Sequence, residues 1–229
     1  MVARDRVLIC DDESQILRAL RVILGDAGFD VVPATTAKEA LDAAAVQRVD
    51  AAIIDLVLPD GDGVEVCGSI REWSQMPVLV LSAVGEEREK IRALEAGADD
   101  YVTKPFSPGE LVARLRAVMR RSASAESEPV LAFGDLEVDL AARRVRRDGV
   151  DIHLTPTELD LLRVLVRDRG KLVTHRALLR EVWGVGYQDD TQTLRVHVAN
   201  LRRKIDPPGE GPRLIRTDPG VGYRFADAD

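Results

Sequence analysis

The 229-residue chain lacks several features that would each indicate a particular class of protein. No apolar run approaches the ~18 residues needed to cross a bilayer, so we expect no association with a membrane. Met1 is followed closely by a strand-like run that begins at Val7, so we expect a cytoplasmic protein rather than a secreted one. There are only two cysteines, Cys10 and Cys67, and neither has a His or Cys neighbour at metal-ligand spacing. Both are therefore expected to be buried, reduced thiols.

An excess of positive charge is also missing. The chain carries 32 Lys and Arg against 39 Asp and Glu, a net charge of −7, which in a single domain would argue against binding to nucleic acid. The imbalance is confined to one part of the chain. Residues 1–121 hold 15 basic and 21 acidic side chains, whereas residues 130–229 hold 17 and 16. The second part is therefore compatible with a nucleic-acid partner.

Residues 1–121 alternate short apolar runs with amphipathic stretches, a pattern typical of successive βα units. In the first amphipathic stretch, Ile16, Leu20 and Leu24 recur at helical spacing and predict one buried face. Five such units predict an α/β domain with a five-stranded parallel sheet and helices on both faces, for which the flavodoxin-like strand order 2-1-3-4-5 is our hypothesis. We expect strands at residues 6–10, 30–34, 51–55, 78–81 and 100–103, and helices at 14–25, 37–47, 63–73, 86–96 and 108–121.

Polar residues stand where these apolar runs end. The first run ends at Asp11 and Asp12, the third at Asp55 and the fourth at Ser82, and the fifth leads into Lys104. In the predicted order, the carboxyl ends of strands 1 and 3 are neighbours at the topological switch point. Three carboxylates there repel one another unless a cation is present, and oxygen ligands suit Mg²⁺. Asp55 is then a candidate nucleophile toward a phosphoryl group, with Lys104 and Ser82 contacting phosphoryl oxygens.

Each of these residues also has a purely structural interpretation. Asp55 could cap the turn after its strand, Asp11 or Asp12 could cap the next helix, Lys104 could be a surface charge, and Ser82 could be a turn residue. Taken singly, the structural interpretations are favoured. Polar groups at four ends of otherwise apolar strands favour a shared site instead.

Five motifs stand at these strand ends in order: Asp11-Asp12, Asp55 followed by Leu58-Pro59-Asp60-Gly61, Ser82-Ala83, Ala96-Gly97-Ala98-Asp99-Asp100-Tyr101, and Lys104-Pro105-Phe106. Over residues 5–121 they resemble the receiver domain of bacterial two-component response regulators. The resemblance implies that Asp55 accepts a phosphoryl group from a sensor histidine kinase. It also implies that Mg²⁺ is held by Asp11, Asp12, Asp55 and the backbone carbonyl of Leu56.

By the same resemblance, Ser82 and Tyr101 form a switch pair and the Lys104–Pro105 peptide bond is cis. Val57 stands two residues after the acceptor, where the family more commonly has a polar or sulfur-containing residue. The resemblance therefore implies no particular lifetime for the phosphoryl group.

Charged residues of both signs recur along the last two helices of this part and the strand between them. They are Lys90, Glu95, Asp99, Asp100, Glu110, Arg114, Arg116 and Arg121. By themselves they are most simply a solvated face with weak ion pairs, each contributing roughly 0 to 1 kcal/mol. The pattern is similar to the charged dimer face of regulators with winged-helix outputs, which implies a homodimer on phosphorylation.

Residues 122–129 are small and polar and end in a proline, which predicts a flexible linker between domains 1–121 and 130–229. Beyond it we expect strands at 130–133, 136–139, 143–147 and 151–153. A helix capped by Thr155 and helices at 174–182 and 191–205 follow, and then a hairpin at 214–225 with glycine at its tip. Three helices followed by a hairpin that bears Arg216 and Arg224 predict an α+β winged helix-turn-helix domain.

The third of these helices carries the candidate nucleic-acid contacts. Leu194, Val198, Leu201 and Ile205 form a narrow apolar stripe that would face the core. The other faces offer side-chain types that suit a major groove, since Asn and Gln can read adenine and Arg can read guanine. A solvated basic face is an equally good interpretation of this helix alone. The candidate contacts, including those of the hairpin, are Gln192, Thr193, Arg195, Val196, His197, Ala199, Asn200, Arg202, Arg203, Arg216 and Arg224.

Three motifs, Leu154-Thr155-Pro156-Thr157-Glu158, Leu201-Arg202-Arg203-Lys204 and Gly220-Val221-Gly222-Tyr223-Arg224-Phe225, resemble the effector domain of the OmpR/PhoB subfamily. More narrowly, Val138-Asp139-Leu140-Ala141-Ala142-Arg143 and Leu179-Arg180-Glu181-Val182-Trp183-Gly184 resemble the regulators of the Kdp potassium-transport operon.

These resemblances imply a phosphorylation-activated transcriptional regulator that binds double-stranded promoter DNA as a dimer, with RNA polymerase as a further partner. Two alternatives stay open. One is a phosphatase or phosphotransferase that turns over through an aspartyl phosphate, although the second carboxylate that such an enzyme places two residues after its nucleophile is Val57 here. The other is a constitutive DNA-binding protein whose first half is a scaffold.

Overall fold

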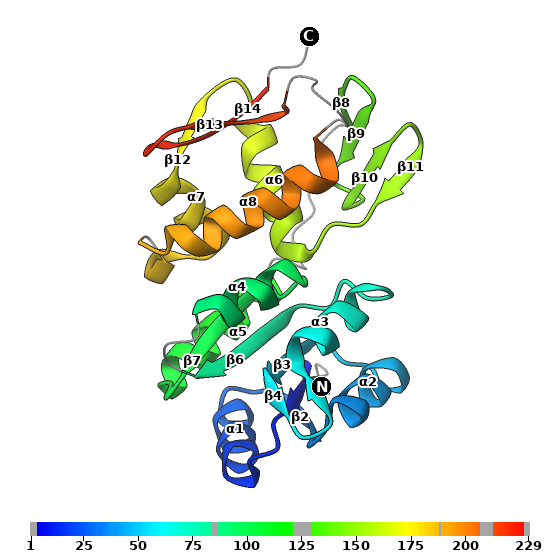
Figure 1. The fold of residues 1–229 in the computed structure, drawn as a ribbon, viewed down its shortest axis with the longest axis vertical. Coiled ribbons are helices and arrows are strands. Elements are labelled where there is room, and N and C mark those ends of the chain that lie inside the picture. The colour runs from blue at the N-terminus through cyan, green and yellow to red at the C-terminus, as the bar shows by residue number, and fades with distance from the viewer. Residues whose placement is uncertain (1–3, 84–86, 121–129, 188, 207–212, 227–229) are drawn as a thin grey trace. The chain divides into compact units, whose positions relative to one another are not determined.

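The computed structural model describes residues 4–83, 87–120, 130–187, 189–206 and 213–226. The chain forms two compact units, Met1–Ser122 and Ala123–Asp229, which are described separately below (Figure 1). The predicted linker at 122–129 lies outside the described residues. Among the residues that the structure describes, no helix is long and apolar enough to cross a membrane.

The first unit is built on a five-stranded parallel sheet in the order β2-β1-β3-β6-β7, which confirms the predicted flavodoxin-like order. Its strands are β1 (Arg6–Cys10), β2 (Asp30–Ala34), β3 (Ala51–Asp55), β6 (Val78–Ala83) and β7 (Asp100–Lys104). Its helices are α1 (Ser14–Asp26), α2 (Ala37–Val46), α3 (Gly63–Arg71), α4 (Glu87–Glu95) and α5 (Pro108–Arg120).

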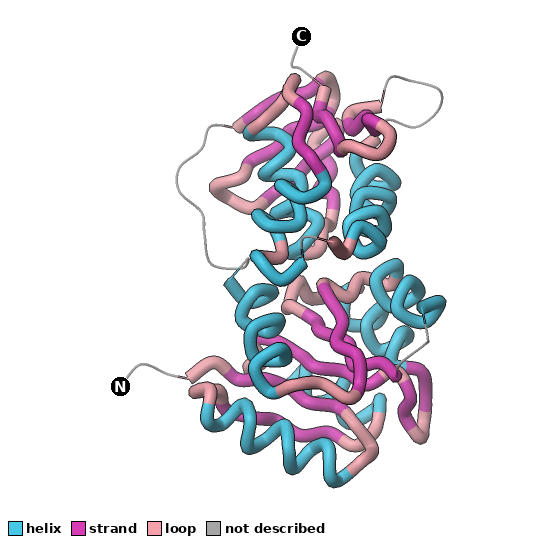
Figure 2. Tube along the Cα trace, turned by 90° about the vertical axis from the view of Figure 1, so that its left-hand side faces the viewer, coloured by secondary structure: helices cyan, strands magenta, loops and turns pink. Residues whose placement is uncertain are grey.

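Helices cover both faces of this sheet, as the tube in Figure 2 shows. On one face, Leu20 and Leu24 of α1 and Leu111 and Leu115 of α5 pack with strand residues such as Ile53 in one buried cluster. Every residue of β3 is buried, which is the reason its sequence is a continuous apolar run rather than an alternating one. The run ends at Asp55 because there the strand reaches the edge of the packed core.

The loop after β3 contains an element that the sequence pattern did not predict. Val57–Leu58 (β4) and Gly61–Asp62 (β5) form a two-residue antiparallel ladder. Its strands are too short to produce an alternating pattern of apolar residues. The ladder folds the chain back from Asp55 to the beginning of α3.

The second unit has an antiparallel sheet, a three-helix core and a second small sheet. The first sheet has the order β11-β10-β9-β8, with β8 (Leu131–Phe133), β9 (Leu136–Asp139), β10 (Arg144–Arg147) and β11 (Val150–Ile152). The helices are α6 (Pro156–Arg167), α7 (His175–Val182) and α8 (Thr191–Ile205), with a short 3-10 helix, η1 (Val185–Tyr187), before α8. Thr155 caps α6 in a reciprocal capping box with Glu158, as its sequence indicated.

The predicted hairpin is present as β13 (Ile215–Asp218) and β14 (Gly222–Phe225), and a third strand joins it. This strand, β12 (Leu172–Thr174), pairs with β14 and gives the order β12-β14-β13. The sequence pattern assigned Thr174 to the second helix, whereas the structure makes Thr174 the N-cap of α7. Three residues are too few for a period-two pattern, so β12 could not be recognised. The arrangement is that of a winged helix-turn-helix domain, with β13 and β14 as the wing.

Both cysteines lie in the core of the first unit. Cys10 at the end of β1 is 1% exposed and Cys67 in α3 is 0% exposed. Burial raises the pKa of each thiol to about 12. Since the thiolate is the reactive form, both groups are inert at neutral pH.

We therefore expect neither thiol of the folded chain to react with iodoacetamide at pH 8, because the thiolate fraction there is on the order of 10⁻⁴. Both should react within minutes once the chain is unfolded in guanidinium. Mass spectrometry of the alkylated protein checks this expectation. A Cys67 that is alkylated as fast as a free thiol in the native protein would show that α3 opens readily from the sheet.

Candidate metal centre and nucleic-acid interface

Three carboxylates converge at the carboxyl edge of the parallel sheet. Asp11 and Asp12 follow β1, Asp55 ends β3, and one carboxylate oxygen from each lies within 4.8 Å of the others. Their proximity follows from the sheet order, because β1 and β3 are paired in parallel register. Asp11 is fully buried and Asp55 is 7% exposed, whereas Asp12 faces solvent. The structure therefore brings together the carboxylates that the sequence singled out.

Lys104 supplies the positive charge that offsets these carboxylates. Its Nζ lies 2.8 Å from Asp11 Oδ2 and 2.5 Å from Asp55 Oδ2, and 3.7 Å from a carboxylate oxygen of Glu13. The Lys104–Pro105 peptide is cis, as the resemblance implied. Burial of the ammonium group lowers the pKa of Lys104, but the hydrogen bonds to Asp11 and Asp55 outweigh this effect and leave the pKa above its ordinary value. Lys104 is therefore a cation at neutral pH.

Asp11 is also held from its own loop. Its Oδ1 accepts a hydrogen bond from the Glu13 amide, 2.8 Å away, at the beginning of α1. Burial raises the pKa of Asp11, and the nearby Asp55 raises it further, against the lowering effect of Lys104 and the Glu13 amide. Asp11 therefore does not cap α1, whose N-cap is Glu13 without a side-chain cap hydrogen bond, but binds the Glu13 amide and lies in the acidic cluster.

The loop after Asp55 is fixed at several points. Asp55 Oδ1 accepts from the Val57 amide at 3.2 Å, and the Leu56 carbonyl oxygen accepts from the Gly63 amide at 2.9 Å. A metal ion bound to the Leu56 carbonyl would therefore share that oxygen with an existing hydrogen bond. Val57 is 69% exposed, so the side chain two residues after Asp55 projects into solvent.

Two further aspartates of this loop hold the neighbouring helices. The carboxylate of Asp60 accepts from the Ala37 and Lys38 amides at the N-terminus of α2, at 2.7 and 3.1 Å. Asp62 caps α3 through the Val64 amide at 2.8 Å and also pairs with Arg92 of α4 at 2.9 Å. The sequence interpretation did not assign these roles. The signal was present, because acidic residues at helix N-termini are typical caps, but the partner of Asp60 is not adjacent in sequence.

Ser82 and Tyr101 lie on the neighbouring strands β6 and β7, Ser82 near the carboxyl edge opposite Thr103 and Tyr101 two residues further from that edge, opposite Val80. Ser82 is fully buried, and within the described part of the chain its Oγ has no hydrogen-bond partner. A buried hydroxyl without a partner costs free energy, so this atom is a candidate to bind a polar group that enters the site. The ring of Tyr101 is partly exposed and lies under Lys90 Nζ, 4.8 Å from the ring centroid.

Some of the charged residues predicted on α4, β7 and α5 form ion pairs or hydrogen bonds within the first unit. Arg114 pairs with Asp100 at 3.4 Å and with Glu110 at 3.0 Å. Arg116 donates to the Ala27 carbonyl at the end of α1, at 3.0 Å. Glu95 is exposed on α4. Arg121, which was predicted for the same face, lies outside the described residues.

The structure corrects the placement of Asp99 and Asp100 on an exposed face, because both side chains are fully buried. The Asp99 side chain accepts hydrogen bonds from Arg71 at 2.7 Å and from the Val78 amide at 2.9 Å. Arg71 Nε also donates to the Gly97 carbonyl at 2.8 Å. Asp99 therefore joins α3, β6 and the loop before β7 inside the unit, because a buried carboxylate requires charge and hydrogen-bond partners.

In the second unit, the exposed stripe of α8 is narrower than predicted. Thr193 is buried and bonded to the N-cap residue Asp190, with its Oγ1 2.9 Å from Asp190 Oδ2. His197 is buried with its ring 5.3 Å from that of Trp183. Val196 and Asn200 are also buried, at 8% and 4% exposed. The candidate residues on α8 that remain exposed are Gln192, Arg195, Ala199 and Arg203, at spacings of three, four and four.

Basic side chains anchor α8 at its C-terminal end. Arg147 of β10 donates to the carbonyl oxygens of Ile205 and Asp206, which end the helix. Lys204 pairs with the buried Glu158 of α6 at 2.6 Å. Because backbone carbonyls at a helix end carry partial negative charge, a guanidinium there stabilises the helix. The sequence did not indicate this role of Arg147, since its partner is 58 residues away.

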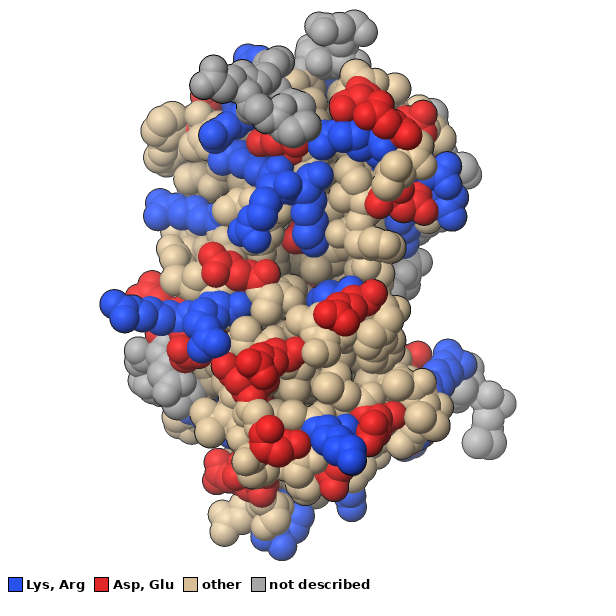
Figure 3. All heavy atoms as spheres, turned by 45° about the vertical axis from the view of Figure 1, so that its right-hand side comes forward, with Lys and Arg blue, Asp and Glu red and all other residues tan. Residues whose placement is uncertain are grey.

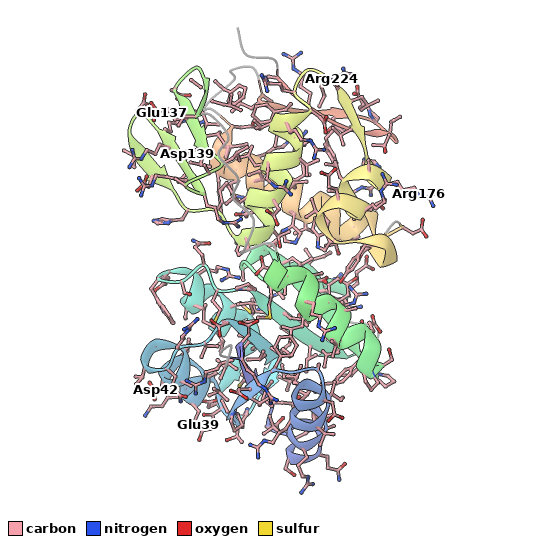
Figure 4. The ribbon with its side chains drawn as sticks, turned by 180° about the vertical axis from the view of Figure 1, so that it is seen from behind. Glu39, Asp42, Glu137, Asp139, Arg176 and Arg224 are labelled. Atoms are coloured by element: carbon pink, nitrogen blue, oxygen red, sulfur yellow. The ribbon has the colours of Figure 1, made fainter. Side chains whose placement is uncertain are left out.

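Of the basic residues predicted on the wing, Arg216 is exposed. Arg224 donates to the Gly170 carbonyl at 2.7 Å and lies 3.3 Å from Asp218. Figure 3 shows Lys and Arg side chains gathered on this unit. Figure 4 places Arg224 at the wing and Arg176 on α7, an exposed arginine that the sequence interpretation left out. In a helix-turn-helix domain, residues that precede the DNA-reading recognition helix can contact the DNA backbone. Because α7 precedes α8, the candidate recognition helix, the basic residues of α7 belong with the candidates.

Comparison with known protein families identifies two domains in the chain. Residues 7–116 match the response regulator receiver domain, and residues 149–225 match the family described as transcriptional regulatory protein, C terminal.

Among curated proteins, the chain is 51% identical over 221 residues to the transcriptional regulatory protein KdpE of Mycobacterium tuberculosis (strain H37Rv), covering 96% of this chain and 98% of that protein. It is 47% identical over 220 residues to the KDP operon transcriptional regulatory protein KdpE of Escherichia coli K12, with 96% and 98% covered. The DNA-binding response regulator MtrA of Mycolicibacterium smegmatis is 41% identical, with 96% of each chain covered.

Among solved structures, the chain is similar to the response regulator DrrB of Thermotoga maritima, an OmpR/PhoB homologue, with a TM-score of 0.53 and 31% identity over 98% of this chain and 100% of that one. It is also similar to a mutant of RitR, with a TM-score of 0.78 and 26% identity over 97% of this chain and 99% of that one.

The close approach of Gly63 to the acidic loop generates a prediction. A Cβ at Gly63 would lie 2.0 Å from the Asp55 carbonyl oxygen and 2.8 Å from Leu56 Cα, so Gly63→Ala forces the backbone after Asp55 to shift. We expect the first unit to lose about 2 kcal/mol or more of unfolding free energy, measured by urea denaturation. Gly68→Ala, in the same helix with no atom within 4 Å of the added Cβ, is the control and should be neutral or stabilising by up to about 1 kcal/mol. Equal stability of the two variants would contradict the described loop geometry.

Proposed function

The chain belongs to the two-component response regulators whose receiver domain precedes a winged-helix, OmpR/PhoB-type DNA-binding domain, and on that premise we propose that Asp55 is its phosphoacceptor. The observation that carries the proposal is the bridging position of Lys104, whose ammonium group contacts both Asp11 and Asp55 where three carboxylates meet. A cation in this position can remain close to Asp55 while phosphoryl oxygens arrive.

The receiver family implies a sensor histidine kinase as the donor. In the proposed step, a carboxylate oxygen of Asp55 attacks phosphorus, and a P–O bond forms as the P–N bond to the kinase histidine breaks. The imidazole nitrogen leaves with the electron pair of that bond, and Asp55 becomes an acyl phosphate. Lys104 pairs with one phosphoryl oxygen, and the buried Ser82 hydroxyl gains the hydrogen-bond partner that it lacks among the described residues.

The acidic cluster fits a divalent cation. Receiver domains generally bind Mg²⁺ at such a group, and carboxylate oxygens of Asp11, Asp12 and Asp55 lie within 4.8 Å of one another. These are the hard oxygen ligands that Mg²⁺ prefers, and the exposed Asp12 leaves one side open to water. We propose that these residues hold Mg²⁺, with the Leu56 carbonyl as a further ligand. When bound, Mg²⁺ would reduce the repulsion between the carboxylates and an incoming phosphoryl group.

Phosphorylation can act on the output through Ser82 and Tyr101. A hydrogen bond from the Ser82 hydroxyl to a phosphoryl oxygen stabilises one conformation of the β6 edge, and Tyr101 on the adjacent strand responds to that shift. The proposed consequence is a homodimer through charged side chains of α4 and α5, such as the partly exposed Lys90 and the exposed Glu95 and Glu110. Asp99 and Asp100 are left out of this proposal because both are fully buried, Asp99 against Arg71 and Asp100 beside Arg114.

DNA binding is the shared property of the effector family, and the exposed stripe of α8 supports a specific interface. We propose that Gln192, Arg195, Ala199 and Arg203 face the major groove and that Arg216 of the wing contacts the phosphate backbone. Dimerisation would raise affinity for a repeated site, because the second domain binds at a high local concentration. RNA polymerase is proposed as a further partner at the promoter.

The identity to KdpE of two bacteria supports a potassium-transport operon as the regulated target. A cytoplasmic location is proposed with it, because promoter DNA is there. Family membership also places the chain among DNA-binding regulators rather than enzymes, so the phosphatase alternative is set aside. The constitutive DNA-binding alternative is tested by the modification of Asp55.

We expect the full chain incubated with acetyl phosphate and Mg²⁺ to gain the mass of one phosphoryl group, and Asp55→Ala to gain none. The reason is that, of the two cluster carboxylates that Lys104 contacts, Asp55 keeps 7% of its surface exposed whereas Asp11 is fully buried. Intact-mass spectrometry measures the gain. Asp42→Ala, which removes an exposed carboxylate on the outer side of α2, is the matched control and should behave as the wild type (Figure 4).

Sedimentation velocity on the same samples measures the expected monomer-to-dimer shift. Persistence of the modification in Asp55→Ala would overturn the assignment of the phosphoacceptor. A wild-type chain that is modified but binds promoter DNA equally well before and after would instead support constitutive binding.

For the nucleic-acid interface, Arg203→Ala should reduce discrimination between a selected DNA site and its single-base variants by about 1 to 3 kcal/mol, since a guanidinium can read guanine in two hydrogen bonds. Competition binding in fixed salt measures the discrimination. Arg144→Ala is the control: this exposed arginine pairs with Asp151 on the β8–β11 sheet, and discrimination should not change. An unchanged preference in Arg203→Ala would show that the outer stripe of α8 does not read bases.

A further inference from the structure

Arg202 lies in the last turn of α8, but its side chain is directed to the wing. Its guanidinium donates two hydrogen bonds to the carbonyl oxygen of Ile215, from Nε at 3.1 Å and from Nη2 at 2.9 Å. Nη2 also donates to Thr217 Oγ1 at 2.7 Å. The guanidinium carbon lies 5.5 Å from the centroid of the Tyr223 ring, within the range of a cation–π contact. Arg202 is partly buried by these contacts.

The carbonyl group that accepts these two hydrogen bonds lies on β13, an edge strand of the small sheet. In the order β12-β14-β13, strand β13 has a paired neighbour on one side only within the part of the chain that the structure describes. The Leu214 carbonyl accepts from the Ala226 amide of the partner strand, and in an antiparallel ladder the next carbonyl points the opposite way. The Ile215 carbonyl therefore points away from β14. Arg202 donates to it from the unpaired side of β13.

The two side chains that Arg202 contacts, Thr217 and Tyr223, lie on one face of the wing, next to the edge carbonyl of Ile215. Ile215 and Thr217 are two residues apart on β13, and Tyr223 is the cross-strand neighbour of Thr217. Arg216 alternates with them and projects from the other face, where it is exposed. A guanidinium that binds the face with Thr217 and Tyr223 therefore also fixes the direction in which the Arg216 side chain projects.

We infer that Arg202 is a positioning residue that locks the wing to the recognition helix, so that α8 and Arg216 engage one DNA duplex at a fixed separation. Arg202 itself makes no phosphate contact in this assignment, in contrast to its role as a predicted DNA contact. The inference rests on the proposed DNA interface and refines it. The ligand that this assignment implies is a double-stranded DNA in which the groove read by α8 and the backbone reached by the wing keep a set spacing.

A direct phosphate contact and a positioning role differ in their dependence on charge. A phosphate contact needs a positive charge, so Lys can replace Arg, and its loss reduces the salt slope of binding by about one. A positioning residue needs the planar fork of the guanidinium, which Lys cannot reproduce. Its loss weakens binding without releasing fewer counterions.

The test uses the full chain treated with acetyl phosphate and one duplex that the wild type selects from a random-sequence library. Arg202→Lys and Arg202→Met should both weaken binding about tenfold or more, since hydrogen bonds to a charged group are lost. The slope of log Kobs against log[KCl] should remain that of the wild type. Thr217→Val, which removes one acceptor and no charge, should weaken binding in the same direction by a smaller factor.

A double-mutant cycle with Arg216→Gln supplies a readout that loss of stability alone would not produce. If Arg202 acts through the wing, Arg202→Lys should have little further effect once Arg216 is replaced. Hydroxyl-radical footprints should lose protection at the flank reached by the wing and keep it in the groove read by α8. Circular dichroism of each variant checks that α8 and the wing remain folded.

Wild-type affinity of Arg202→Lys, together with a slope reduced by about one in Arg202→Met, would establish a phosphate contact and overturn the inference. Additive effects of Arg202→Lys and Arg216→Gln, or wild-type binding by Thr217→Val and Arg202→Lys alike, would also overturn it. Failure of the wild type to select any duplex would be a different result, because it would overturn the proposed DNA interface from which the inference starts.

Discussion

The receiver unit depends on an electrostatic constraint at the edge of its sheet. Parallel pairing of β1 and β3 brings the carboxylates of Asp11 and Asp55 together, and Asp11 is fully buried. Removing charge from water costs several kcal/mol unless a partner of opposite charge is close. Lys104 from β7 is that partner. The same ammonium group therefore allows the folded acidic cluster to exist and, in the proposed reaction, pairs with the phosphoryl group.

Much of this site could be predicted from the sequence, because it depends on strand order and on what ends each strand. Asp55 follows four buried apolar residues, and the alternation of strands and helices indicated a parallel sheet, for which the flavodoxin-like order was the hypothesis that the structure confirms. The supports of the site were not predictable in the same way. Asp60 holds the N-terminus of a helix 23 residues earlier in the chain, and Gly63 is required by the proximity of the Asp55 carbonyl. Such contacts depend on tertiary packing, which leaves no periodic signal in the sequence.

In the recognition helix α8, the sequence predicted the buried core residues but not the contacts of the polar ones. Its core stripe of Leu194, Val198, Leu201 and Ile205 is buried as the helical period indicated. Periodicity could not show that Thr193 belongs to the N-terminal cap or that His197 packs against Trp183, because both depend on the segment that precedes the helix. Nor could it distinguish an arginine that faces DNA from one that holds an edge strand, since both look like exposed basic residues in a sequence.

In the second unit, Arg147 holds together two elements that are far apart in the sequence. It connects β10 of the N-terminal sheet to the carbonyl oxygens that end α8, while Lys204 ties the same helical turn to α6. The last turn of α8 is therefore joined to two separate elements, and β10 cannot shift along the helix without breaking the hydrogen bonds of Arg147 to Ile205 and Asp206 or moving the end of the helix with it.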